Sequence, residues 1–208
     1  MNPDKYQQAV IDEYARTNRN IFVSATAGAG KTTLLVELSR RTPPTRDSIF
    51  LAFNKSIAQE LANRLPPDRK AQTLHSCALS ALRRACKIDI DITDSKYFQM
   101  ALDELKWPEK LPVKQKMSQC GKVARLYDLM RVNCLYGDEK AVFELGLRYG
   151  EEVSDTIVSQ AIRLHAIATQ FADRFFFGNV GGKLKMDFTD MLTFAIKYVP
   201  DGDFRKYS

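Results

Sequence analysis

A glycine-rich run over residues 25–32, Ala-Thr-Ala-Gly-Ala-Gly-Lys-Thr, directly follows the apolar residues Ile21, Phe22 and Val23. Triphosphate oxygens need several main-chain N–H donors aimed at one point, and a turn with few side chains lets those donors converge. Gly28 and Gly30 provide the backbone freedom, and a helix beginning near Lys31 would offer its free N–H groups to the phosphates. This run, called the phosphate loop below, predicts binding of a nucleoside triphosphate.

Two side chains at the end of the phosphate loop carry the expected catalytic roles. Lys31 would reach the β- and γ-phosphates, and the Thr32 hydroxyl would hold Mg²⁺. The residues expected around the phosphates are Ala27, Gly28, Ala29, Gly30, Lys31, Thr32 and Thr33. A glycine-rich turn that binds nothing is the alternative, and the general pattern begins with Gly where this chain has Ala25. The apolar run before the loop and the helical pattern of residues 33–38 after it favour a nucleotide site.

Composition indicates a globular chain with a partner of opposite charge. The chain has 208 residues, 45% hydrophobic and 27% charged, enough for one or two domains with a real core. A net charge of +6 favours a polyanion such as nucleic acid, although a merely basic protein has the same balance. The four cysteines form no C-x-x-C pair and the two histidines complete no metal set, so reduced thiols in a cytoplasmic or nuclear protein are expected.

Targeting and membrane segments are not expected. The start of the chain, Met1 to Lys5, is polar and unlike a signal peptide. No apolar run approaches the ~20 residues that a membrane-spanning helix needs, so no membrane partner is predicted.

Strand and helix patterns alternate along the first part of the chain. Expected helices cover 4–17, 31–41, 55–65 with Asn54 as N-cap, and 75–86, and expected strands cover 21–24, 48–53 and 72–74. Such alternation predicts an α/β fold with a parallel sheet covered on both faces.

The second part of the chain, from about 88 to 178, has almost only helical patterns. An apolar stripe marks 122–136, and a long helix is expected over 151–177. Residues 178–182 read as a return loop, with Lys183 and Lys185 beside it either touching a phosphate backbone or simply solvated. A final helix over 187–199 should rejoin the first domain.

Further segments narrow the choice among the many classes of phosphate-loop protein. Gln7 precedes the first expected strand, 52–61 follows the second, 73–76 follows the third, and Asp-Phe-Thr-Asp-Met occupies 187–191. In this order they resemble the N-terminal half of superfamily 1 helicases of the UvrD/Rep type. Residues 53–58 are most similar to the F-box DNA helicase branch and its phage and bacterial relatives. Alanine at the head of the loop is also common in this family.

The resemblance implies a P-loop NTPase fold with a RecA-like parallel sheet and an inserted all-helical subdomain. The motor domain would comprise 1–87 plus 186–208, incomplete at its C-terminus, and the helical insertion 88–185. ATP and Mg²⁺ are the implied cofactors.

Two side chains would contact bases. Gln7 would read the adenine edge, because an amide both donates and accepts; Gln8 takes that role if the register shifts by one, and a solvated helix glutamine is the alternative. Phe53 would offer a ring on which a DNA base stacks, with a core position at a strand end as the alternative.

Five side chains would contact the DNA backbone without reading sequence, namely Asn54, Lys55, Thr73, His75 and Ser76. Hydroxyls, amides and helix N-termini suit such phosphate contacts. For Asn54, the role of helix N-cap is a sufficient structural explanation, and His75 could equally be a half-buried structural histidine.

Two positions carry other expectations from the resemblance. Several relatives have Arg where this chain has Thr33, so adenine preference would be weaker here or rest more on Gln7. Asp187 and Asp190 are expected mainly to pack the last helix rather than to act directly.

The family's next element, a strand ending in Asp-Glu, is not found after Asp187, and residues 201–203 read as a turn. Phosphoryl transfer needs such carboxylates to hold the metal and position water. The expectation is a truncated piece that binds nucleotide and, weakly, single-stranded DNA, but does not turn over ATP or unwind a duplex alone.

The function that follows is the N-terminal part of an ATP-dependent DNA helicase, with 3′ to 5′ translocation suggested by the resemblance. A monomer is expected, with DNA repair or replication proteins as further partners. A non-catalytic, nucleotide-dependent DNA- or protein-binding module and an unrelated phosphate-loop kinase or ATPase are the alternatives.

Overall fold

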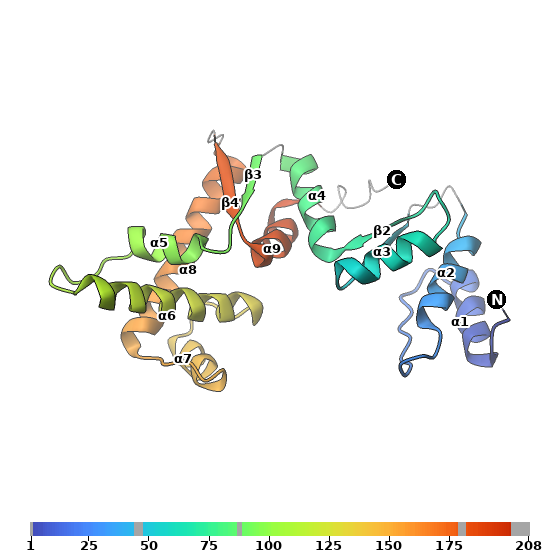
Figure 1. Ribbon diagram of the computed structural model, residues 1–208, viewed down its shortest axis with the longest axis horizontal. Helices are drawn as coiled ribbons and strands as arrows, with labels where there is room; N and C mark the ends of the chain where they lie inside the picture. Colours follow the sequence, from blue (N-terminus) through green and yellow to red (C-terminus); the bar gives the residue numbers. More distant parts are fainter. Residues whose placement is uncertain (1, 44–47, 87–88, 179–181, 201–208) are drawn as a thin grey trace. The chain divides into compact units, whose positions relative to one another are not determined.

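The computed structural model describes residues 2–43, 48–86, 89–178 and 182–200 (Figure 1). These residues form two compact units. Unit 1 contains the described residues up to Cys77 together with Pro200, and unit 2 runs from Ala78 to Val199. The division into a motor domain and a helical insertion at residues 87 and 186 stays a prediction. No helix in the described ranges is long and apolar enough to cross a lipid bilayer.

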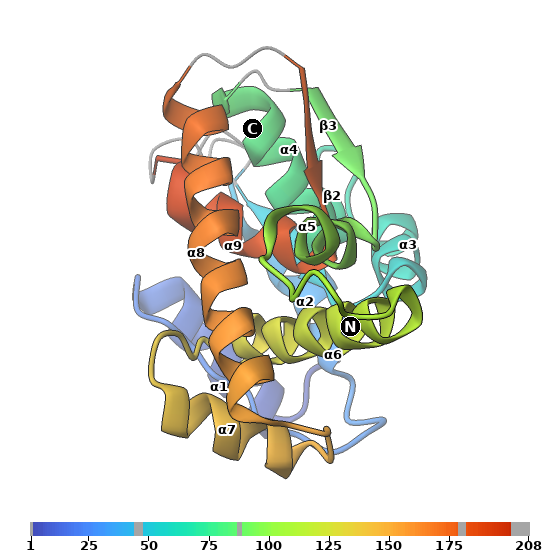
Figure 2. The same ribbon diagram turned by 90° about the vertical axis from the view of Figure 1, so that its left-hand side faces the viewer.

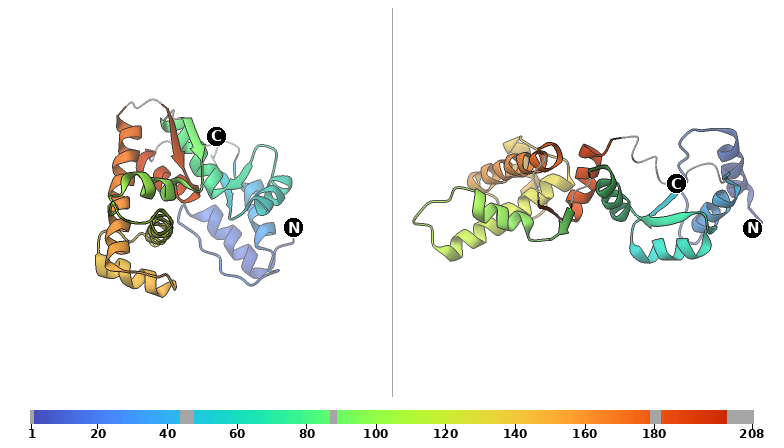
Figure 3. Two further views of the ribbon diagram at one scale, coloured as in Figure 1. Left: turned by 60° about the vertical axis from the view of Figure 1, so that its left-hand side comes forward. Right: turned by 90° about the horizontal axis from the view of Figure 1, so that it is seen from above.

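Unit 1 alternates helices and short strands, largely as its sequence predicts. Its elements are α1 (Lys5–Arg16), α2 (Lys31–Arg41), β1 (Ile49–Ala52), α3 (Lys55–Arg64), β2 (Lys70–Thr73) and the beginning of α4 (Leu74–Cys86). β1 and β2 pair in parallel, with Ala52 opposite Thr73. α3 packs along both strands (Figures 1 and 3), and Val36, Ala58 and Leu61 are buried there.

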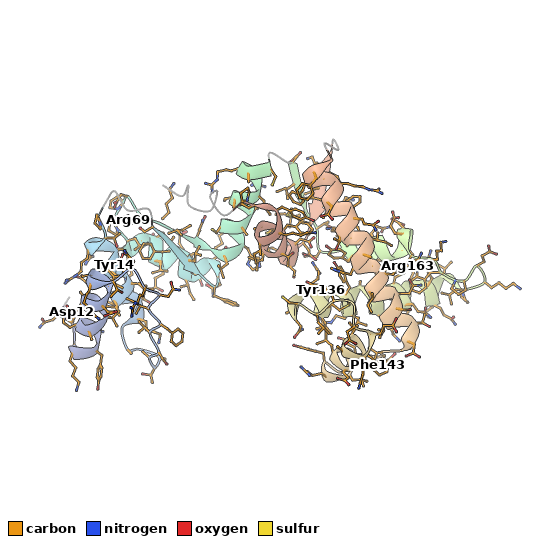
Figure 4. The ribbon with its side chains drawn as sticks, turned by 180° about the vertical axis from the view of Figure 1, so that it is seen from behind. Asp12, Tyr14, Arg69, Tyr136, Phe143 and Arg163 are labelled. Atoms are coloured by element: carbon orange, nitrogen blue, oxygen red, sulfur yellow. The ribbon has the colours of Figure 1, made fainter. Side chains whose placement is uncertain are left out.

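One side chain ties the strands of unit 1 to the end of α2. Arg69 is buried, and its guanidinium donates to the Ser48 hydroxyl at 2.9 Å and to the Thr42 carbonyl oxygen at 2.8 Å. The Thr42 hydroxyl also pairs with the hydroxyl of Tyr14 from α1 at 2.7 Å (Figure 4). Hydrogen bonds of this kind satisfy buried polar groups and hold neighbouring elements in register.

The strand expected over 21–24 does not form. Residues 21–26 lie outside any strand, and the side chains of Ile21, Phe22 and Val23 are 36%, 93% and 39% exposed. A strand exists only where its N–H and C=O groups find a neighbouring strand. Among the described residues β1 pairs only with β2, so this apolar run lacks a partner. The expected RecA-like sheet is therefore corrected to two separate two-stranded parallel pairs.

Asn54 caps α3 as expected, because its side-chain oxygen accepts a hydrogen bond from the Ile57 amide at 2.9 Å. Asn54→Ala removes this acceptor and is expected to lower the free energy of unfolding by about 1 kcal/mol. Asn54→Asp keeps an acceptor in the same place and should lose only a small part of that amount. Urea denaturation of both variants, together with the hydrogen-exchange rate of the Ile57 amide, measures the difference. Equal stability of the Ala and Asp variants would contradict the capping role.

Unit 2 is built mainly of helices packed on one another (Figure 2). Its elements are β3 (Asp89–Ile92), α5 (Lys96–Glu104), α6 (Val113–Val132), α7 (Glu139–Arg148), α8 (Asp155–Phe177), β4 (Lys183–Met186) and α9 (Phe188–Tyr198), with most of α4. α6 packs against α5, α7 and α8, and Val123, Leu126 and Met130 from the expected stripe are buried. α6 starts earlier than expected and ends at Val132. Part of the expected return loop, 179–181, and the turn at 201–203 lie outside the described residues.

A second parallel strand pair corrects the expectation of an almost wholly helical region. β3 pairs with β4, with Ile90 opposite Leu184. Leu184 and Met186 are fully buried, whereas Lys183 and Lys185 are exposed. The two lysines are therefore strand residues rather than loop residues. Alternation with period two is the sequence signal of such a strand, and in Lys-Leu-Lys-Met it is only four residues long.

A buried ion network joins α5, α6 and α9. Asp190 has no exposed surface, and it accepts hydrogen bonds from Lys96 Nζ at 2.8 Å, the Tyr97 hydroxyl at 2.6 Å and Arg131 Nη1 at 2.9 Å. The two terminal nitrogens of Arg131 also donate to the two carboxylate oxygens of Asp187, at 2.8 and 2.6 Å, in a bidentate ion pair. Asp187 and Asp190 also cap α9 reciprocally. The expectation that this motif packs the last helix is confirmed.

Burial and pairing oppose each other in the pKa values of this network. Burial lowers the pKa of Lys96, and the nearby Asp190 only partly offsets that loss of hydration. For Asp187, burial alone would raise the pKa, but the Arg131 guanidinium outweighs it and the pKa is lowered. Arg131 is thus the main group that favours the ionised form of this carboxylate.

Candidate nucleotide and nucleic-acid site

The phosphate loop reaches α2 through two glycines in the left-handed region. Gly28 has φ of +78° and Gly30, the N-cap residue of α2, has φ of +76°. Side chains are strained at such angles, and a Cβ on Gly30 would also lie only 2.9 Å from Gln7 Nε2. The positive φ therefore favours glycine at position 30, and a larger residue would also displace the end of the Gln7 side chain.

Lys31 is the first residue of α2, and its side chain reaches back to the turn of the phosphate loop. Its Nζ donates to the main-chain oxygens of Ala25 at 2.7 Å and Thr26 at 2.6 Å. Thr32 and Thr33 follow in the first turn of α2, where main-chain N–H groups lack partners within the helix. The loop thus combines an ammonium group with the positive end of a helix, which is the chemistry that holds phosphate.

A cavity of about 510 Å³ adjoins the phosphate loop within unit 1. It is lined by Asp4, Tyr6, Gln7, Val10, Phe22, Val23, Ser24, Ala25, Thr26, Ala29, Lys31 and Leu34. Its size is that of a pocket for a small organic ligand. Sequence reasoning assigned Tyr6, Val10 and Phe22 to no binding site, although helical spacing places Tyr6 and Val10 on one face of α1.

Gln7 lies against the phosphate loop, whereas Gln8 does not. Gln7 Nε2 donates to the Ala29 carbonyl oxygen at 3.3 Å, and its Oε1 accepts from the Asp4 amide at 3.2 Å. Gln8 instead donates to Asp12 along the helix at 2.6 Å. Gln7 therefore connects the beginning of α1 to the phosphate loop.

Arg64 brings a guanidinium to the start of α2, and no sequence signal pointed to it. Its Nη2 donates to the Thr33 hydroxyl at 3.0 Å, while Nη1 pairs with Glu60 at 3.3 Å. α3 thereby places a positive charge beside the position where the resemblance led us to note a missing arginine.

The two segments expected to contact DNA follow neighbouring parallel strands. Phe53 comes directly after Ala52, which lies opposite Thr73, the last residue of β2. Since parallel strands end at the same edge of their sheet, both segments begin at one edge. Phe53 is 88% exposed, so it does not occupy the core position considered as its alternative.

The remaining predicted DNA-contact residues lie at the starts of α3 and α4. Asn54 Oδ1 accepts from the Ser56 hydroxyl at 2.9 Å as well as from the Ile57 amide of α3. Lys55 is exposed. The Thr73 hydroxyl accepts from the Ser76 amide at 3.2 Å, so it caps α4. Ser76 is exposed and His75 is half-buried.

Comparison with known proteins gives one result. The model of the AAA domain family matches residues 7–189. No curated protein and no solved structure shows a significant match. The matched range begins at Gln7 and includes the phosphate loop, the segments after β1 and β2, and the Asp187 cap. The chain therefore belongs to the AAA domain family, a helicase-like family of nucleotide-binding P-loop proteins.

Proposed function

We propose that this chain is an ATP-binding, single-stranded-DNA-binding motor part of an ATP-dependent DNA helicase. The observation that carries the proposal is the register of β1 and β2, with Ala52 opposite Thr73. It sets an exposed aromatic ring, Phe53, at the same sheet edge as a second segment rich in polar groups. A ring that stacks on any base, beside hydroxyls and helix starts that hold phosphates, suits a strand bound without regard to sequence.

The nucleotide half of the proposal rests on the phosphate loop and its cavity. Lys31 and the N–H groups at the start of α2 would hold the β- and γ-phosphates, and the adjoining cavity would take the base beside Gln7. The Thr32 hydroxyl is a donor atom of the kind that Mg²⁺ prefers, and the bound ion would neutralise charge on the phosphates. The free energy of nucleotide binding could then be coupled to the affinity for single-stranded DNA. Movement in the 3′ to 5′ direction belongs to the same proposal.

Phe53→Ala is the variant that tests the DNA half. Stacking of a base on an aromatic side chain contributes roughly 1–3 kcal/mol, so the affinity for oligothymidylate should fall roughly 5- to 150-fold. Phe53→Trp should retain binding because it keeps a ring face. Fluorescence anisotropy of a labelled oligonucleotide at one stated salt concentration measures both.

The matched control is Tyr149→Ala, which removes an exposed aromatic ring outside the proposed site. It should leave the affinity for the oligonucleotide unchanged. Unchanged binding by the Phe53→Ala variant would remove the main support for a strand-binding edge.

A positive result in an ATP turnover assay, run with and without single-stranded DNA, would separate a complete motor from the non-catalytic module. Turnover stimulated by DNA would support a motor whose site is complete. Nucleotide and DNA binding without turnover, by this chain alone, would fit either the regulatory module or a motor that needs carboxylates from elsewhere.

A further inference from the structure

A second cavity, of about 330 Å³, lies wholly within unit 2 and plays no part in the site described above. It is lined by Tyr97, Tyr127, Arg131, Tyr136, His165, Ala168, Thr169, Asp190, Thr193, Phe194, Lys197 and Tyr198. The lining comes from α5, α6 and the residues after it, α8 and α9. Six of the twelve lining residues are tyrosine, phenylalanine or histidine, so the cavity has a largely aromatic character.

The rings are arranged in packed pairs around the cavity. Tyr136, which follows α6 (Figure 4), stacks on His165 with ring centroids 4.3 Å apart and planes inclined by 17°. Phe194 and Tyr198 meet edge to face with centroids 5.7 Å apart. Tyr136 is 41% exposed, so its ring is fixed by His165 yet still accessible. A ring held in this way loses little freedom when a flat ligand stacks on it.

Arg131, one of the lining residues, has a buried hydrogen-bond donor without a partner among the described residues. Its side chain is 5% exposed, and its two terminal nitrogens are used by Asp128, Asp187 and Asp190. Its Nε is buried and has no hydrogen-bond partner among the described residues. A buried donor without an acceptor is costly, so a ligand that supplies an acceptor would gain from this group.

The charges around the cavity are compensated. Arg131 is paired with Asp187 and Asp190, and Lys197 is paired with Asp173 at 2.9 Å. Burial lowers the pKa of His165, and the nearby Lys197 lowers it further, so both effects favour the neutral imidazole. A site with balanced charges favours a neutral ligand over a phosphate group.

We propose that this cavity binds one unstacked nucleobase of single-stranded DNA. The base would stack on Tyr136, with a ring nitrogen or carbonyl oxygen facing Arg131 Nε. The volume, at the lower end for ligand pockets, suits a single base rather than a longer segment. This inference rests on the proposed function, since it requires that the chain binds DNA. A free nucleoside carries the same base and could stack in the same way, so the test distinguishes binding of a free nucleoside from binding of a DNA strand.

The test compares two oligomers of equal length that differ only in their bases. One is oligothymidylate, and the other has the same phosphates on abasic tetrahydrofuran units. Tyr136→Ala should lower the affinity for oligothymidylate roughly 5- to 150-fold and leave the weak affinity for the abasic oligomer unchanged. Tyr136→Phe keeps the ring and should retain affinity. Tyr149→Ala removes a ring of similar exposure away from the cavity and should have no effect.

The outcomes separate this inference from the proposed function. If Phe53→Ala weakens oligothymidylate binding and Tyr136→Ala does not, the cavity inference is overturned while the proposed function stands. If Tyr136→Ala weakens both oligomers equally, the base contact is also overturned, because the loss then involves no base. Binding of free thymidine that needs Tyr136, without any effect of Tyr136 on oligonucleotide affinity, would overturn the assignment to a strand. If the wild-type chain binds neither oligomer, both proposals fail together.

Discussion

Asp190→Ala is expected to lower the free energy of unfolding of unit 2 by about 3–5 kcal/mol, because it leaves buried cations without their shared partner. Lys96 is 6% exposed and Arg131 5% exposed, and both contact the Asp190 carboxylate. The Tyr97 hydroxyl would lose its acceptor as well. The sole tryptophan, Trp107, lies in unit 2, so its fluorescence in a urea titration follows the unfolding of this unit.

The matched control is Glu152→Ala, which breaks the exposed ion pair between Glu152 and Lys122 in the same unit. Exposed pairs contribute little to stability, so this change should cost far less than Asp190→Ala does. Similar losses in the two variants would show that burial of the network has no special energetic effect.

A pH series gives the Asp190→Ala prediction a second readout. Burial already lowers the pKa of Lys96, and removal of Asp190 should lower it further. Between that folded-state pKa and the ordinary value of 10.5, the unfolded chain binds more protons than the folded one. The free energy of unfolding of the variant should therefore rise with pH over this range. The difference in free energy of unfolding between the variant and the wild type should become smaller. A deficit independent of pH would mean that lost packing, rather than an unpaired ammonium group, causes the change.

Lys31→Ala is expected to weaken Mg-ATP binding by roughly 100-fold, equivalent to about 3 kcal/mol for a lost charged hydrogen bond to phosphate. The change also removes the bonds from Nζ to the Ala25 and Thr26 carbonyl oxygens, which shape the loop. Isothermal titration calorimetry with a non-hydrolysable ATP analogue and Mg²⁺ measures the loss directly.

Lys70→Ala serves as the control, because Lys70 is an exposed lysine of unit 1 on β2 and outside the cavity beside the loop. It should bind Mg-ATP as the wild type does. Retention of wild-type affinity by the Lys31→Ala variant would show that the loop does not bind the triphosphate through this ammonium group.

Much of unit 1 could be predicted because its signals are local. Asn54 before a helical pattern predicts a cap, and Gly28 and Gly30 predict positive φ, from single residues and their neighbours. The strand expected over 21–24 shows the limit of this reasoning. An apolar run indicates only that burial of its side chains is favourable. Whether it forms a strand depends on a neighbouring strand from elsewhere in the chain.

The contacts that sequence reasoning missed join residues far apart in the chain. Lys96 and Asp190 are 94 positions apart, and Arg64 and Thr33 are 31 apart. Neither pair has a periodic pattern or a motif that could have revealed it. Gln7 is the opposite case, since the resemblance pointed to it and the structure then distinguished it from Gln8 by their different hydrogen-bond partners.

The edge where β1 and β2 end has an electrostatic consequence beyond its side chains. α3 and α4 each begin directly beyond one of these strands, and every α-helix carries about half a positive elementary charge at its N-terminus. Two helix dipoles therefore converge near one sheet edge, and their donors belong to the main chain. Attraction of a polyanion to this edge would therefore persist after replacement of Lys55 or His75, because it does not depend on those side chains.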